Sequence, residues 1–164
     1  SWARDVYKRQ LAALGFELPD APAPLARHAI ACPALPTCGL AITESERILP
    51  SVLDRLDAQL RRLEIDKSML IRMTGCPNGC ARPYMAELAL VGSGVNQYQL
   101  WLGGSANLQR LAQPFLQRMP LDDLEQTIEP LLISWKQAGG RRSFGDHVEK
   151  LGGQAVSKLL GVAA

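Results

Sequence analysis

Four cysteines are the residues of this chain whose type and spacing point most directly to chemistry. They occur as two pairs, separated by five and by three residues: Cys32 with Cys38, and Cys76 with Cys80. Both pairs lie in proline-containing segments, and the second pair encloses the tripeptide Pro-Asn-Gly. Proline fixes one backbone angle, and Asn and Gly tolerate left-handed conformations, so this segment can turn tightly around a bulky group. The pattern indicates an inorganic centre shared by the two loops.

Three kinds of chemistry fit four thiols: two disulfides, one zinc ion, or an iron–sulfur cluster. A chain of 164 residues that is 47% hydrophobic can build a core and does not depend on disulfides for stability. Zinc ligands are commonly only two residues apart, whereas a cuboidal cluster is wide enough for a spacing of five. The spacing therefore favours an iron–sulfur cluster and leaves zinc open.

Other reaction templates are absent from the sequence, including the nucleophile elbow, the phosphate-binding loop and the His-Glu-x-x-His zinc motif. The two histidines, His28 and His147, do not have zinc-finger spacing to either cysteine pair. We interpret His28, which leads into the first cysteine loop, as a surface or hydrogen-bonding residue rather than as a ligand or proton donor. The cysteines remain the concentrated signal.

The charge and hydropathy patterns argue against two classes of partner. The net charge is only +2, and no long basic run accompanies it, so binding to nucleic acid or to an anionic membrane surface is not expected. The sequence contains no run of about 18 apolar residues, which argues against a membrane-spanning helix.

The segments around the cysteines predict an α/β fold, in which a small mixed sheet is flanked by helices and the cluster-binding loops lie at strand ends. Met69–Met73 predicts a buried strand that leads directly into the second cysteine loop. Met85–Val91 and Tyr98–Leu102 predict two further strands, joined by a turn at residues 92–94. The sheet is thus expected to position Cys76 and Cys80.

Helices are expected before and after these strands in the sequence. The first carries an apolar stripe from Leu49 to Leu63, with Thr43 and Glu46 at capping-box spacing and Pro50 at the start of a second segment after a bend. A later helix has acidic residues in its first turn and ends at a Gly-Gly pair. The expected helices cover residues 43–63, 107–117, 121–138 and a short last segment from Phe144.

The first 26 residues are interpreted as a linker or as the remnant of a preceding domain. Leu11, Leu14 and Leu18 have helical spacing, but three prolines come after them within residues 19–24 and stop any helix. Residues 1–10 fit poorly with the rest of the chain and are interpreted as a foreign end. Residues 27–164 are expected to form one domain.

The two cysteine segments, Cys-Pro-Ala-Leu-Pro-Thr-Cys-Gly-Leu-Ala and Thr-Gly-Cys-Pro-Asn-Gly-Cys-Ala-Arg-Pro, resemble the sulfite and nitrite reductase family, which couples sirohaem to a [4Fe-4S] cluster. The resemblance extends from Arg27 through most of the chain. Pro-Ala-Leu-Pro-Thr in the first segment is more similar to assimilatory sulfite reductases than to nitrite reductases. The segments 81–87 and 98–104 resemble the ferredoxin-dependent branch of the family.

This resemblance implies a role for each cysteine. All four would ligate the [4Fe-4S] cluster, and Cys80, the last of them, would also bridge to the sirohaem iron as its proximal ligand. Asn78 and Arg82, inside and beside the second loop, would contact the cofactors. Their alternative roles are those of a turn residue and a surface cation.

The implied activity is the six-electron reduction of sulfite to sulfide with electrons from ferredoxin, in the cytoplasm or, in a plant or alga, in the plastid stroma. In this family the basic residues that bind sulfite come from the preceding half of a much longer chain. Residues 27–164 are therefore expected to be the C-terminal cluster and sirohaem domain, inactive alone. The alternatives are a related nitrite reductase, a simple iron–sulfur electron carrier and a zinc-stabilised binding module.

Overall fold

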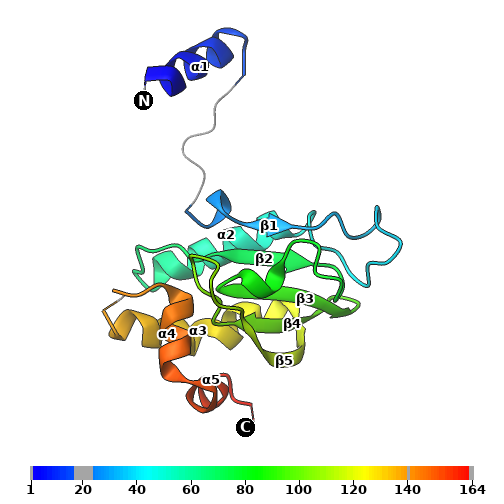
Figure 1. The fold of residues 1–164 in the computed structure, drawn as a ribbon, viewed down its shortest axis with the longest axis vertical. Coiled ribbons are helices and arrows are strands. Elements are labelled where there is room, and N and C mark those ends of the chain that lie inside the picture. Colours follow the sequence, from blue (N-terminus) through cyan, green and yellow to red (C-terminus); the bar gives the residue numbers. More distant parts are fainter. Residues whose placement is uncertain (1, 17–23, 140, 163–164) are drawn as a thin grey trace.

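The computed structural model describes residues 2–16, 24–139 and 141–162, and its centre is a mixed sheet of five strands (Figure 1). The strands are β1 (Ile30–Ala31), β2 (Ile71–Thr74), β3 (Leu88–Gly94), β4 (Gln97–Leu102) and β5 (Gln113–Pro120). They lie side by side in sequence order, with β1, β2 and β3 parallel and with β4 and β5 continuing as an antiparallel meander. The expected α/β fold with a small mixed sheet is confirmed.

Helices lie mainly on one face of this sheet. The helices are α1 (Trp2–Ala13), α2 (Leu49–Arg62), α3 (Leu124–Gln137), α4 (Phe144–Leu151) and α5 (Gly153–Leu159). Short 3-10 segments are η1 (Pro24–Arg27), η2 (Pro83–Met85) and η3 (Leu121–Asp123). In Figure 1, α2 and α3 lie behind the strands, α4 and α5 come after α3, and α1 stands apart from the sheet. None of the helices in the described ranges is long and apolar enough to cross a membrane.

The main core lies between the sheet and helices α2 and α3. The predicted stripe of α2 is confirmed, because its leucines and valine are buried and its last member is partly buried: Leu49, Val52, Leu53, Leu56, Leu60 and Leu63. On the sheet, two cross-strand rows belong to the same core: Ile71, Leu88 and Leu102, and Met73, Leu90 and Leu100. Burying each such side chain contributes about 1.5–3 kcal/mol, so the parallel strands form a stable platform for the loops at their ends.

The start of α2 differs from the prediction. The helix begins at Leu49, with Pro50 in its first turn as expected, rather than at Thr43. The predicted capping box is wrong because the Thr43 hydroxyl has other partners: it contacts the Tyr98 hydroxyl and accepts a hydrogen bond from the Asn96 N–H. Residues 43–48 therefore belong to the loop after Cys38.

The helix predicted over residues 107–117 is also wrong, because residues 113–120 form β5. This edge strand pairs with β4, with Met119 opposite Tyr98 and Gln113 opposite Leu102. Met119 is its only buried residue, so the alternation typical of a strand is hidden in the sequence. The turn predicted at residues 92–94 is displaced as well, since β3 continues to Gly94 and Asn96 takes the left-handed conformation of the turn.

The two ends of the chain contain more helix than expected. Residues 2–13 form α1 within the segment interpreted as a linker; of the leucines with helical spacing, Leu11 lies in this helix and Leu14 follows its end. Leu18, Pro19 and Pro22 lie outside the described residues. The helix predicted over 121–138 is observed as η3 followed by α3, and the last predicted helix is observed as α4 with α5 after it.

Candidate metal centre

Both cysteine loops leave the sheet at the carboxyl edge of its parallel strands. Cys32 directly follows β1, and Cys76 follows β2 after a single glycine. The two strands pair in register, with Ala31 opposite Met73, and the Cys32 N–H donates to the Met73 carbonyl at 3.2 Å. Because the carboxyl ends of parallel strands meet at one edge, the two loops lie side by side there. The prediction that the loops stand at strand ends is confirmed.

Gly75 joins the second loop to the first through its backbone. Its N–H donates to the Cys32 Sγ at 3.3 Å, and its carbonyl accepts from the Ile42 and Thr43 N–H groups at 2.9 and 3.1 Å. A Cβ at this position would lie 2.5 Å from the Thr43 carbonyl oxygen and 2.6 Å from the Ala34 Cβ. The contact therefore requires glycine, and it fixes the Cys32 thiol relative to the segment that carries Cys76.

The four thiols differ in exposure. Cys32 and Cys76 are buried, at 8% and 7% exposed, Cys38 is half-buried, and Cys80 is exposed. None of the four, all of which the structure describes, is part of a disulfide. Within the described ranges, no three Cys, His, Asp or Glu side chains are grouped as ligands of one metal ion. A [4Fe-4S] cluster places iron and sulfide between its thiolates, so it requires soft donors around a wider centre, and four thiols on two adjoining turns are the donor set it takes.

The turn from Cys76 to Cys80 has the conformation that its composition predicts. Gly79 adopts φ +68°, and its N–H donates to the Cys76 carbonyl. The Arg82 N–H then donates to the Gly79 carbonyl at 2.7 Å. Asn78 and Arg82 lie on this turn with Cys80, and Arg82, like Cys80, is exposed. The structure thus brings Asn78, Cys80 and Arg82 together on one short segment, and their contacts to a cofactor remain a prediction.

A buried tyrosine holds the far end of the first loop. Hydrogen bonds run from the Asn96 N–H to the Thr43 Oγ1 (3.2 Å), between Thr43 Oγ1 and the Tyr98 hydroxyl (3.1 Å), and from that hydroxyl to the Glu44 carbonyl (2.7 Å). Tyr98 is fully buried, and burial raises the pKa of its phenol, so it stays a neutral donor. Sequence reasoning treated Tyr98 only as a strand residue; its one signal was a hydroxyl at an inward position, which needs a partner.

Behind the second loop lies Arg72 of β2, which sequence reasoning did not single out. It is 4% exposed, and its Nη1 donates to the Ala81 and Arg82 carbonyls at 3.4 and 3.1 Å. Burial lowers the pKa of Arg72, and the like charge of Arg82 adds to the effect. The guanidinium therefore braces the segment directly after Cys80.

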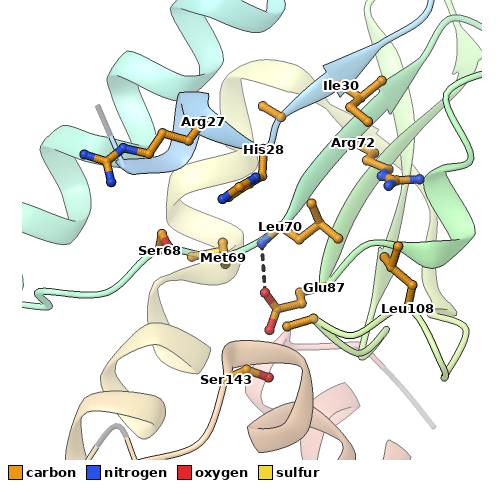
Figure 2. Close-up of a pocket in the computed structure, with 12 residues that line it drawn as sticks. Arg27, His28, Ile30, Ser68, Met69, Leu70, Arg72, Glu87, Leu108 and Ser143 are labelled. Carbon is orange, nitrogen blue, oxygen red and sulfur yellow. Dashed lines mark hydrogen bonds between the residues drawn. The ribbon is translucent and has the colours of Figure 1, made fainter. Parts of the chain in front are cut away.

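A cavity of about 570 Å³ opens between the starts of β1 and β2 and the loop before β3, and Arg72 is one of the residues that line it (Figure 2). Glu87 is among the lining residues, and its two carboxylate oxygens accept from the Leu70 N–H at 2.8 Å and the Gly145 N–H at 2.9 Å. His28 also lines the cavity and is exposed, in agreement with its interpretation as a surface residue. The lining residues in the described part of the chain include none of the cysteines.

Known proteins are similar to this chain in sequence and in fold. The profile of the nitrite and sulphite reductase 4Fe-4S domain matches residues 23–162. The chain is 54% identical over 137 residues to the sulfite reductase (ferredoxin) of Synechococcus elongatus. The matched residues cover 82% of this chain and 22% of that protein. It is 45% identical over 133 residues to the sulfite reductase (NADPH) hemoprotein beta-component of Chromohalobacter salexigens, covering 79% of this chain and 23% of that protein.

Among solved structures, the Mycobacterium tuberculosis NirA protein has a similar fold. The TM-score is 0.68 at 23% identity, over 90% of this chain and 29% of that chain. The chain spans about a quarter of the length of the curated relatives it matches.

Proposed function

Because the chain belongs to the nitrite and sulphite reductase 4Fe-4S domain family, we propose that it holds a [4Fe-4S] cluster and presents it to sirohaem in a sulfite reductase. The observation that carries the proposal is the junction of the two cysteine loops at the carboxyl edge of β1 and β2. There the Gly75 N–H donates to the Cys32 Sγ at 3.3 Å, which supports the assignment of two loops distant in sequence to one ligand set. When bound, the cluster and sirohaem supply the stored electrons and the iron at which sulfite is reduced.

The exposure of the thiols supports different roles for them. We assign all four cysteines as cluster ligands, with Cys32 and Cys76 on the buried side. Cys80 is the exposed thiol, and we assign it the additional role of proximal ligand to the sirohaem iron, because a second large cofactor needs access to that sulfur. Asn78 and Arg82 share this segment and are assigned to contact the sirohaem, whose carboxylates suit an amide and a guanidinium.

Substrate and donor are inferred from the relatives. We propose sulfite as the substrate and ferredoxin as the electron donor, because the 54% identical relative is a ferredoxin sulfite reductase, and we place the enzyme in the cytoplasm. Residues 27–164 are proposed to form the cofactor domain. We expect this chain alone not to reduce sulfite, because it spans about a quarter of those relatives and the family's sulfite-binding basic residues are expected in the remainder.

Anaerobic reconstitution of the chain with iron and sulfide tests the ligand assignment. We expect about four iron and four sulfide per chain, broad visible absorption, and a one-electron signal in electron paramagnetic resonance after reduction with dithionite. Cys32→Ser or Cys76→Ser should abolish stable incorporation of the cluster. A colourless product that takes up zinc and no iron–sulfur cluster would refute the proposal.

The role of Cys80 is tested in the longer protein, in which sirohaem is incorporated. Serine at Cys80 should reduce the sirohaem signal more than serine at Cys32, because Cys80 is assigned to two irons. Equal loss in the two variants would contradict the bridging role. Parallel assays with sulfite and nitrite distinguish the proposed substrate from that of a nitrite reductase.

A further inference from the structure

Arg72 carries a buried charge that the proposed ligand set does not use. It sits within β2, between Ile30 of β1 and Ala89 of β3, and it is 4% exposed. In Figure 2 its side chain lies on the opposite side of the cavity from Arg27. A charged side chain is almost never this buried unless another charge or a ligand compensates it. The buried charge of Arg72 therefore requires a compensating group.

The described residues provide no compensating acid. Arg72 takes part in none of the ion pairs found among them. Its Nη1 is held by two neutral carbonyls, and its buried Nε has no partner in the described structure. The charged neighbour that perturbs it is Arg82, which has the same sign. Its positive charge is therefore not cancelled within the described part of the protein.

The position of Arg72 connects it with the thiols. One carbonyl that it contacts belongs to Ala81, the residue directly after Cys80. Ala81 also packs with Cys32 and Ala34 in a small buried cluster. The Arg72 guanidinium thus contacts Ala81, which directly follows the proposed ligand Cys80 and packs against the proposed ligand Cys32.

We propose that Arg72 is the counter-charge of the thiolate-ligated cluster and that it raises the reduction potential of that cluster. This inference rests on the proposed function, because it needs a cluster at the four cysteines. Thiolates give the cluster a net negative charge, and uptake of one electron from an external reductant makes that charge more negative. A fixed, uncancelled cation nearby stabilises the reduced form more than the oxidised form. Because Arg72 is 4% exposed, salt screens this effect less than it would for a surface cation.

The test uses the reconstituted 164-residue chain and measures the midpoint potential by dye-mediated titration with dithionite, followed by electron paramagnetic resonance. Arg72→Met should lower the potential. At the wild-type midpoint, the ratio of reduced to oxidised cluster should fall about tenfold, which corresponds to about 59 mV for a one-electron couple. Arg72→Lys keeps the charge and should keep most of the potential. Arg62→Gln on α2 removes an exposed cation paired with Glu129 and should leave it unchanged.

Three outcomes separate the alternatives. An unchanged potential in Arg72→Met with the cluster retained would overturn the inference, and so would equal shifts in Arg72→Met and Arg72→Lys, which would indicate a structural role through the two carbonyls. Arg72→Gln retains a donor for those carbonyls and replaces Arg72→Met if the latter does not fold, as judged by circular dichroism; the same lowered potential is expected. A wild-type chain that binds no cluster would refute the proposed function itself.

Discussion

Replacing Tyr98 with phenylalanine removes one oxygen atom and tests how the first cysteine loop is held. The ring stays in the core, where Tyr98 is fully buried. The variant loses the hydrogen bond to the Glu44 carbonyl and the contact with the Thr43 hydroxyl, at 2.7 and 3.1 Å. Thr43 also donates its N–H to the Gly75 carbonyl, and the Gly75 N–H donates to the Cys32 thiol, so the lost hydroxyl is linked through two residues to the proposed ligand set.

The size of the effect can be worked out from these two bonds. Each intramolecular hydrogen bond contributes about 0.5–1.5 kcal/mol net, and a buried carbonyl left without a donor costs about 1–3 kcal/mol. Tyr98→Phe should therefore lower the free energy of unfolding by about 2 kcal/mol. For a domain of this size, that loss corresponds to a decrease in Tm of about 4–8 °C.

Urea unfolding of the cluster-free chain, followed by circular dichroism, measures this change. Tyr7→Phe is the matched control, because Tyr7 is 67% exposed on α1, and it should change the unfolding free energy by less than about 0.5 kcal/mol. Thr43→Val completes a double-mutant cycle with Tyr98→Phe, and the two changes should be non-additive by about 0.5 kcal/mol or more. A loss below about 0.5 kcal/mol for Tyr98→Phe, or strict additivity, would refute the reasoning.

Three further predictions concern other contacts. Gly75→Ala should destabilise the chain by about 1–3 kcal/mol and prevent cluster uptake, because a Cβ would lie 2.5 Å from the Thr43 carbonyl oxygen. Urea unfolding measures the loss of stability, and iron content measures the cluster uptake. Normal uptake would contradict this prediction. Glu87→Gln should cost about 1–3 kcal/mol in the same unfolding assay, because its amide NH₂ would face one of two backbone N–H groups; an unchanged midpoint would count against this. Burial lowers the pKa of His147 below 6.5, and nearby cations add to the effect, so the contribution of His147 to stability is full above pH 6.5 and decreases as the pH falls and the unfolded chain takes up a proton. Tm measured against pH should show this decrease in the wild type and a smaller one in His147→Asn. Equal decreases in the two proteins would contradict this.

The sequence was informative where a local pattern decides the structure. The alternation of Tyr98, Leu100 and Leu102 predicted β4, and the spacing of the apolar residues in α2 predicted its buried face. The cysteine loops were placed at strand ends because a buried apolar strand leads into Cys76. In each case the period of the side chains is itself the physical cause of the element.

The sequence was uninformative where a distant partner decides. β5 is a strand because β4 pairs with it, and its own exposed residues show no period of two. Thr43 has the spacing of a helix cap, but its hydroxyl forms a hydrogen bond with the hydroxyl of Tyr98, 55 residues away in the sequence. Arg72 resembles an ordinary strand residue until the fold places Ala81 over it. Such contacts depend on tertiary structure, which propensity does not encode.

The junction at Gly75 also bears on how this molecule tolerates substitution. The hydrogen bonds that join the two loops run from the Ile42 and Thr43 N–H groups to the Gly75 carbonyl and from the Gly75 N–H to the Cys32 Sγ, so only the peptide backbone and one cysteine sulfur make them. Leu40 and Ile42 on the same loop are 72% and 40% exposed. Their side chains can therefore be exchanged without altering the spacing of the thiols. These two positions can diversify, in evolution or by redesign, while the ligand geometry beneath them is retained.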